Sequence, residues 1–455
     1  MSVDTTITNC KIVRHDGILN AGLAIDQGKV VAIAHDDALP SAAKTVDGRG
    51  NYLIPGVVDA HVHLEYPPGV DPESNIQKET RACAAAGCTT IVHLLAPADD
   101  ILGKAREFIG FYEKNAFVDL ALSARIYTRD NIKQIRRLLD YGICNVKLLL
   151  PYKGGEAVWK GRVGGVDDGI IYLTFKEVGR LAKEGRKAFV RVHCENVEIF
   201  FKMKDEFLEQ GTEPTSWHEV RPSVCEEEAM RKCLYLAAVT ECPIYIVHMT
   251  IKEGVPLVNK ARAQGVNVVA ETCVQYLTLN TDNVDRVLSK INPPIREPED
   301  NQALWKALKE GTIDVVATDH APVPKDLKKN LWDATPGIPG AETFLPLMLS
   351  EGVNKGRISL EKLVAVCCYN PARQFGLAPQ KGTIDIGSDA DLVLIDLDKE
   401  AEAPPRPIYS NADYSLFTGR KIKGWPIMTM LRGNIVAQGG KVIAETGEGR
   451  YIYRE

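Results

Sequence analysis

The sequence lacks the features by which several protein classes are recognised. No apolar run approaches the roughly 18 residues of a membrane-spanning helix, and Met1 to Thr6 do not open a signal peptide. The formal net charge is −5 without any basic block, so neither nucleic acid nor an anionic membrane surface is expected as a partner. Internal repeats, low-complexity tracts and long charge runs are also missing. What is left is a globular protein with an ordinary composition and a large core.

The eleven cysteines show no Cys-x-x-Cys spacing, which excludes the simplest zinc and redox motifs. Cys144 and Cys273 fall in apolar strand-like runs, and Cys83 and Cys233 fall in helical segments, where a thiol behaves as a small buried hydrophobe. An odd number of thiols in a chain of 455 residues suits a reducing compartment. We therefore predict a cytoplasmic protein with free cysteines.

Between Pro55 and about residue 378, apolar runs alternate with amphipathic segments such as Ser74–Ala86 and Ile132–Tyr141. Near-continuous apolar strands that alternate with helices indicate a parallel sheet covered by helices. Eight such runs predict an α/β fold, a (β/α)8 TIM-like barrel with its active site at the C-terminal ends of the strands. The runs are Val57–Leu64, Thr89–Leu95, Val118–Ala124, Ile143–Leu150, Ala188–His193, Pro243–His248, Val266–Glu271 and Ile313–Asp319.

Both ends of the chain show short β segments instead. Residues 1–54 contain a strand candidate at Thr6–Val13 and a hairpin whose strands flank the Asp26–Lys29 turn. Further strands are expected in residues 379–455, and neither end can bury much surface alone. We therefore predict that 1–54 and 379–455 form one small composite β-sandwich beside the barrel of 55–378. Two helices are expected at 341–349 and 360–368, the second ended by Asn370-Pro371.

The first barrel run ends in His61-Val62-His63. Side chains at i and i+2 of a strand share a face, so two imidazoles would project side by side from a rigid support. Alone, this pattern is more often the polar end of a strand than a metal site.

Four more residues of metal-ligand type fall at the ends of other predicted strands. Each has an ordinary explanation: a histidine can cap a buried strand, a lysine can extend to solvent, and an aspartate can cap a helix. Together with the two histidines they occupy the positions where a barrel carries its catalytic groups, which favours a metal centre. The four are Lys147, His193, His248 and Asp319.

With these residues in this order, the chain resembles the cyclic amidohydrolases, the metal-dependent family of hydantoinases, dihydropyrimidinases, allantoinases and dihydroorotases. The resemblance extends from the first β segment to Gly419–Pro426. Three segments look closest to hydantoinases and dihydropyrimidinases: Pro151-Tyr152-Lys153-Gly154, Glu271-Thr272-Cys273-Val274-Gln275-Tyr276-Leu277 and Asn292-Pro293-Pro294-Ile295-Arg296.

The resemblance implies two divalent ions, usually zinc, bridged by a carbamylated Lys147 and a hydroxide. His61, His63 and Asp319 would hold one ion, and His193 and His248 the other. An ammonium between two cations would be repelled, whereas a carbamate is an anionic oxygen donor that can bridge them. Four imidazoles with carboxylate oxygens suit zinc best, while manganese, cobalt and iron stay open. The resemblance also implies a homotetramer.

The same resemblance assigns roles in catalysis. The bridging hydroxide attacks the ring carbonyl, and Asp319 carries its proton to the leaving ring nitrogen. Tyr152 is placed to donate to the developing oxyanion, although it also fits an aromatic residue packed at the barrel mouth. Asn292 lies where relatives use a small polar residue whose backbone meets the ring amide.

The remaining expected substrate contacts, Glu65 and Gly337, mark departures from the family pattern. Glu65 stands where dihydroorotases carry an arginine for the substrate carboxylate. Pro336-Gly337 stands where hydantoinases carry Asn-Gly. The glycine-rich loop 153–168, with Trp159 in its middle, fits either a lid over the site or a solvated excursion.

The expected activity is metal-dependent hydrolysis of a ring C–N bond in a hydantoin- or dihydropyrimidine-like cyclic amide or imide. Allantoinase or another cyclic amidase of the superfamily is the alternative. A mononuclear deaminase would not need Lys147, and a non-catalytic scaffold relative would have lost metal ligands that are all present here.

Overall fold

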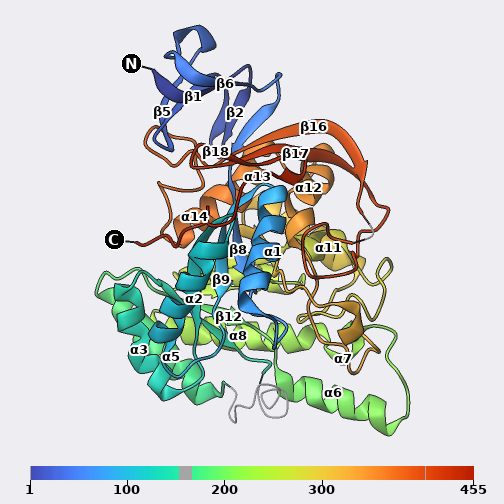
Figure 1. The fold of residues 1–455 in the computed structure, drawn as a ribbon. Helices are drawn as coiled ribbons and strands as arrows, with labels where there is room; N and C mark the ends of the chain where they lie inside the picture. Colours follow the sequence, from blue (N-terminus) through green and yellow to red (C-terminus); the bar gives the residue numbers. More distant parts are fainter. Residues whose placement is uncertain (1, 153–165, 405, 455) are drawn as a thin grey trace.

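The computed structural model describes residues 2–152, 166–404 and 406–454, and it contains the predicted barrel (Figure 1). Eight parallel strands follow one another in sequence order around it. The last returns to the first, because the backbone N–H of His63 donates to the His320 carbonyl at 2.9 Å. The strands are β8 (Val57–Val62), β9 (Cys88–Leu94), β10 (Asp119–Arg125), β11 (Asn145–Leu149), β12 (Phe189–His193), β13 (Ile244–Ile246), β14 (Val268–Cys273) and β15 (Val315–Ala317).

Helices surround the barrel, and several begin at side-chain caps that the sequence supplies. Asp71 accepts from Ser74 N–H with Pro72 in the first turn, and Thr128 accepts from Asn131 N–H. The longer helices are α1 (Pro72–Ala85), α2 (Ile101–Asn115), α3 (Arg129–Asp140), α5 (Asp168–Lys183), α6 (Val197–Glu209), α8 (Ser223–Thr240), α9 (Gly254–Ala263) and α11 (Pro298–Glu310). Short ones are α7 (Trp217–Val220) and α10 (Val274–Thr278). Among the described helices, none is both long and apolar enough to span a membrane.

The two helices expected after the last barrel strand are less regular than predicted. The first consists of a 3₁₀ turn (Ala341–Thr343), the short α12 (Phe344–Leu347) and a π-helical segment (Met348–Asn354). The second, α13 (Leu360–Val364), continues as a π-helical segment (Ala365–Tyr369) into α14 (Asn370–Gln374). The prediction that Asn370-Pro371 ends it was wrong, because α14 begins at Asn370 directly after the π-helical segment and has Pro371 in its own first turn, where proline is tolerated.

Two further sheets lie above the barrel in Figure 1. A four-stranded sheet has the order β5-β4-β1-β6, with β1 (Val3–Thr8), β4 (Gly22–Asp26), β5 (Lys29–Ala34) and β6 (Ala42–Asp47). A seven-stranded sheet has the order β19-β18-β17-β16-β7-β2-β3. Its strands are β2 (Lys11–Arg14), β3 (Gly17–Asn20), β7 (Tyr52–Pro55), β16 (Leu392–Glu402), β17 (Lys421–Leu431), β18 (Asn434–Gln438) and β19 (Lys441–Val442).

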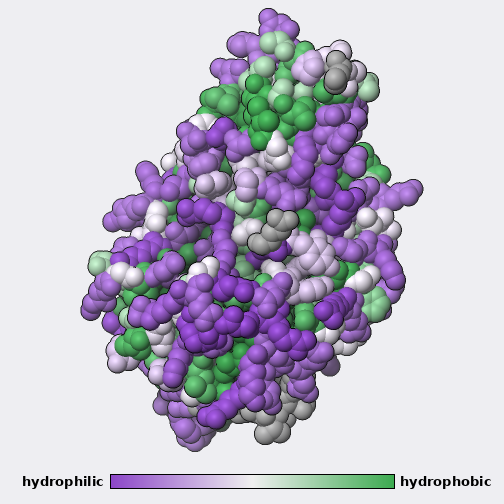
Figure 2. Space-filling view, turned by 90° about the vertical axis from the view of Figure 1, so that its left-hand side faces the viewer, coloured by the Kyte–Doolittle hydropathy of each residue, from purple (hydrophilic) through white to green (hydrophobic). Residues whose placement is uncertain are grey.

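The two chain ends share the seven-stranded sheet, because β7 pairs antiparallel with β16 and Leu53 lies opposite Leu394. One apolar cluster joins the two sheets and includes Ile7, Leu23 and Met430. The expected single strand Thr6–Val13 is instead β1 and β2, in different sheets, since the chain turns at Asn9, whose φ is +51°. The predicted domain boundaries at 54 and 378 stay predictions. Figure 2 shows a mostly hydrophilic face with an apolar area at the top, over the N-terminal strands.

A buried ionic cluster joins the start of barrel strand β10 to the C-terminal part of the chain. Lys381 Nζ lies 2.5 Å from Asp119, 2.9 Å from Asp389 and 2.6 Å from Asp391. Arg432 adds a contact of 2.5 Å to Asp119. The three carboxylates are close enough to hold a cation, but Lys381, Arg432 and Lys29 together already balance their three charges.

Replacing Lys381 by methionine removes the shared cation and leaves buried carboxylates uncompensated. We expect Lys381→Met to lower the free energy of unfolding by about 3–5 kcal/mol, measured by denaturant unfolding. Lys29→Met is the control, because the Lys29 side chain is 44% exposed and pairs with Asp389 at the cluster edge. Lys29→Met should lower the free energy of unfolding by less than about 1 kcal/mol. Equal effects of the two substitutions would contradict this interpretation.

Candidate active site

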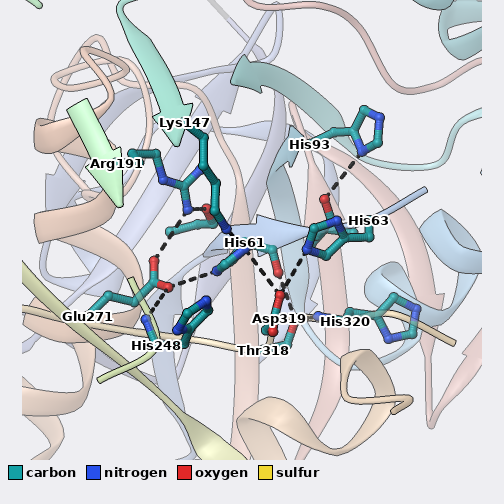
Figure 3. A network of polar contacts seen from close by, with 12 residues as sticks. His61, His63, His93, Lys147, Arg191, His248, Glu271, Thr318, Asp319 and His320 are labelled. Atoms are coloured by element: carbon teal, nitrogen blue, oxygen red, sulfur yellow. Dashed lines mark hydrogen bonds and ion pairs between the residues drawn. The ribbon is translucent and has the colours of Figure 1, made fainter. Parts of the chain in front are cut away.

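The six residues predicted to bind metal converge at the C-terminal ends of the barrel strands. Figure 3 labels five of them: His61, His63, Lys147, His248 and Asp319. They come from the ends of five strands: His61 from β8 and His63 from just beyond it, Lys147 from β11, His193 from the end of β12, His248 from just beyond β13 and Asp319 from just beyond β15.

Asp319 lies close to the two histidines at the end of the first barrel strand. Its Oδ1 lies 3.1 Å from His61 Nε2 and 2.9 Å from His63 Nε2. Lys147 Nζ lies 2.5 Å from the same His61 Nε2. One ligand atom from each of His61, His63 and Asp319 lies within 4.8 Å of the others, close enough to hold one ion.

His193 and His248 form the other half of the cluster. Their ring centroids are 4.3 Å apart in an edge-to-face arrangement, and the His248 ring lies 5.4 Å from that of His61. Tyr152 stands at the edge of this half, with its ring centroid 6.1 Å from that of His193. The two halves therefore form one continuous group of ligand-type side chains.

His248 and Asp319 have left-handed backbone conformations, with φ of +38° and +50°. Such φ values are costly for residues other than glycine and persist only where neighbouring contacts enforce them. At Asp319 the contacts come from Asp59, which accepts from Thr318 Oγ1 at 2.6 Å and from Thr318 N–H at 3.1 Å. These left-handed turns follow β13 and β15, and they bring His248 and Asp319 into the same cluster as the ligand-type residues on the other strands.

Two buried glutamates support the histidines, and the sequence analysis missed both. Glu271 Oε1 lies 2.9 Å from His61 Nδ1, and Glu195 Oε2 lies 2.6 Å from His193 Nε2. Arg221 contacts Glu195 at 3.1 Å, and with His193 it holds the pKa of Glu195 at about 2, although burial alone would raise it. The signals available were the Glu195 position two residues after His193 and the end of β14, a strand without a predicted ligand.

Burial keeps the imidazoles neutral. It lowers the pKa values of His61 and His248 well below the usual range, and the Lys147 ammonium lowers both further. Burial also lowers the pKa of Lys147 to about 7, with the nearby Arg191 guanidinium acting in the same direction. Neutral imidazole is the form of histidine that binds metal.

The residues present fit divalent cations. His248 Nδ1 is buried and has no hydrogen-bond partner among the described residues, which is costly unless another group pairs with it. Four imidazoles with one carboxylate are the donors that zinc and similar ions prefer.

The family profile described as "Amidohydrolase family" matches residues 52–436. The chain belongs to this family. The resemblance found in the sequence is thus confirmed, and the family is metal-dependent.

Named relatives match over nearly the full length. The L-hydantoinase of Paenarthrobacter aurescens is 34% identical, with 99% of this chain and 98% of that protein covered. A D-hydantoinase of Ralstonia pickettii is 33% identical, with 99% of both covered. An allantoinase of Bacillus licheniformis is 31% identical, with 99% and 100% covered. The solved structure of an L-hydantoinase (dihydropyrimidinase) from Arthrobacter aurescens superposes with a TM-score of 0.92 at 33% identity, with 99% of this chain and 100% of that chain covered.

Glu65, predicted as a substrate contact in this amidohydrolase, is held by other groups. Its carboxylate lies 2.9 Å from Lys104 Nζ, accepts from Ala96 N–H at 2.7 Å and lies 3.2 Å from His93 Nε2. Burial opposes its ionisation, yet these contacts, His93 foremost, lower the pKa of Glu65 to about 2. Lys104 balances the charge of Glu65, so this carboxylate adds little repulsion toward an anionic substrate.

The other predicted substrate contacts also have partners within the protein. Asn292 Oδ1 accepts from Trp217 Nε1 at 2.9 Å. Gly337 has φ of +138°, and a Cβ there would meet the Ala321 carbonyl oxygen at 2.8 Å, so only glycine fits. Substrate contact by Tyr152, Asn292, Glu65 and Gly337 stays a prediction. The predicted lid with Trp159 falls mainly on 153–165, outside the described residues.

The backbone carbonyl of Lys290 connects the segment of Asn292 to Gly337 and to the buried side chain of Lys328. The Lys290 carbonyl accepts from Gly337 N–H at 3.0 Å and from Lys328 Nζ at 2.8 Å. Burial lowers the pKa of Lys328 to about 7, and the positive charge of Lys290 lowers it further.

This shift predicts a pH dependence of stability. Between about pH 7 and the usual lysine pKa of about 10.4, the unfolded chain holds a proton that folded Lys328 has released. The contribution of Lys328 to the free energy of unfolding therefore rises with pH across this window, by up to about 4 kcal/mol. Lys328→Met should remove this contribution and so lower the slope of the free energy of unfolding against pH relative to wild type, as measured by urea unfolding at pH 6.5 to 10 in about half-unit steps.

The neighbouring Lys329→Met is the matched control, because Lys329 is exposed. It should keep the wild-type slope. A Lys328→Met protein with that slope would show that Lys328 titrates normally.

Proposed function

We propose that this protein hydrolyses the ring C–N bond of a cyclic amide or imide of the hydantoin or dihydropyrimidine type. The observation that carries the proposal is the convergence of four histidines and Asp319 around buried Lys147 at the barrel mouth. Full-length similarity to proteins named hydantoinase supports this ring class.

The proposed cofactors are two divalent ions, with zinc as the expected metal. His61, His63 and Asp319 would hold one, His193 and His248 the other, and a carbamylated Lys147 would bridge them. Only a neutral amine reacts with carbon dioxide, and a lysine with a pKa of about 7 is partly neutral at physiological pH. When bound, such ions lower the pKa of water and polarise a carbonyl group.

The side chains of the protein complete the reaction. Asp319 accepts the proton of the attacking water and delivers it to the ring nitrogen as the C–N bond breaks and the new C–O bond remains. Tyr152, beside His193, donates a hydrogen bond to the carbonyl oxygen as it becomes negative. The backbone near Asn292 and Gly337 holds the amide edge of the ring.

Allantoin hydrolysis is the second candidate, because the allantoinase relative matches the full chain at an identity close to that of the hydantoinases. The mononuclear deaminase and non-catalytic scaffold alternatives are less well supported, since all six ligand positions are filled. Eleven free, buried cysteines suit the predicted cytoplasmic location. That location and the homotetramer stay predictions.

Metal content tests the binuclear site. Wild-type protein prepared with zinc and bicarbonate should contain close to two ions per chain by elemental analysis. Lys147→Ala should contain fewer than one and lose about 10³-fold or more in kcat/KM, because the bridging anion is gone. Added short carboxylates should restore part of the activity.

Lys187→Ala is the control, since the Lys187 ammonium donates to the Arg373 carbonyl. It should keep both ions and full activity. A Lys147→Ala protein with near-normal turnover would show that Lys147 is an ordinary strand lysine.

A substrate panel tests the ring class. We expect kcat/KM for dihydrouracil, a 5-substituted hydantoin or a simple cyclic imide to exceed that for dihydroorotate by about 10³-fold, since no arginine stands at position 65 to pair with its carboxylate. Allantoin is measured alongside and decides the second candidate. Dihydroorotate as the best of the five would overturn the assignment.

A further inference from the structure

Glu271 links both halves of the candidate metal site, although its strand β14 supplies none of the predicted ligands (Figure 3). Its Oε1 lies 2.9 Å from His61 Nδ1 and accepts from the backbone N–H of His248 at 3.1 Å. Its Oε2 accepts from Tyr245 OH at 2.6 Å and lies 3.5 Å from Arg191. One carboxylate oxygen thus contacts a predicted ligand of each ion.

We propose that Glu271 is a positioning residue that orients His61 and His248 together, so that the affinities for both ions depend on this one carboxylate. The inference rests on the proposed function, because it takes His61 and His248 as metal ligands.

The contact with His61 fixes the tautomer of its ring. Both oxygens of Glu271 already accept hydrogen bonds, Oε1 from His248 N–H and Oε2 from Tyr245 OH, so His61 Nδ1 is the donor to Oε1 and carries the proton. The lone pair of Nε2 then faces Asp319 at 3.1 Å and Lys147 at 2.5 Å, on the side of the site. Without the carboxylate, the ring could carry its proton on Nε2 and lose the ability to bind metal there.

His248 depends on Glu271 through its backbone. The residue has a costly φ of +38°, and the N–H bond to Glu271 is among the contacts that hold it. Its Nδ1 has no hydrogen-bond partner among the described residues. The ring direction is therefore set by the backbone and by packing against His193, not by a hydrogen bond of the ring.

Glu271 is itself held in place from two sides. Tyr245 OH and Arg191 both contact Oε2 of Glu271. Arg191 also donates to the carbonyl of Ala60, the residue before His61, at 2.8 Å. The Glu271 side chain has no exposed surface. Glu195, by contrast, contacts only one predicted ligand, His193, so Glu271 is the support shared by both ions.

The test compares metal affinity in Glu271→Gln and wild type, measured by chelator competition, together with the absorption spectrum of the Co²⁺-loaded protein. We expect affinity for both ions to fall about 10–100-fold and the Co²⁺ bands to shift. Glu226→Gln is the matched control: Glu226 is equally buried and pairs with Arg296 at 3.2 Å, but no predicted metal ligand is among its hydrogen-bond partners. It should keep wild-type affinity and spectrum.

Wild-type affinity and spectrum in Glu271→Gln would overturn the inference, as would equal losses in Glu271→Gln and Glu226→Gln. If Glu271→Gln does not fold, Tyr245→Phe replaces it in the test, because it removes only the hydrogen bond to Oε2. The affinities for both ions should then fall by a few-fold. Unchanged affinities would count against the inference. A wild-type protein without metal would overturn the proposed function and this inference with it.

Discussion

The contact between the first and last barrel strands is the constraint on which the candidate site depends. His63 N–H donates to the His320 carbonyl at 2.9 Å, and His320 N–H donates to the His61 carbonyl at 3.3 Å. Thr318 binds Asp59 on the same seam. Because both partners of this seam carry predicted ligands, closing the barrel and assembling the His61, His63 and Asp319 group are one event.

The site also requires that charge be buried deep in the barrel. Lys147 and Arg191 are fully enclosed near the histidines, and Glu271 supplies the opposing charge. Removing Arg191 or Glu271 would leave the charge of the other unbalanced in a medium that solvates it poorly. The same network that orients the ligands therefore makes it possible to place a lysine of low pKa inside the barrel.

Sequence periodicity was sufficient for the barrel and for the six candidate ligands, because strand ends of a closed parallel barrel must meet at one face. It did not reveal the left-handed turns at His248 and Asp319, which depend on tertiary contacts such as those of Asp59. Glu271 and Glu195 were missed for a related reason: their positions near strand ends can be read from the sequence, but the histidine that each one contacts cannot. The break at Asn9 was hidden by apolar residues on both sides.

The pairing of β7 with β16 has a consequence for biosynthesis. Leu53 and Ile54 are fully buried in the finished protein, but the strand that covers the edge of β7 is made only after the whole barrel has been synthesised. During translation this apolar edge stays open, and open strand edges are where nascent chains associate wrongly. A pairing so distant in sequence also forms slowly. The interval between synthesis of β7 and synthesis of β16 is therefore the period in which this edge is exposed to wrong association.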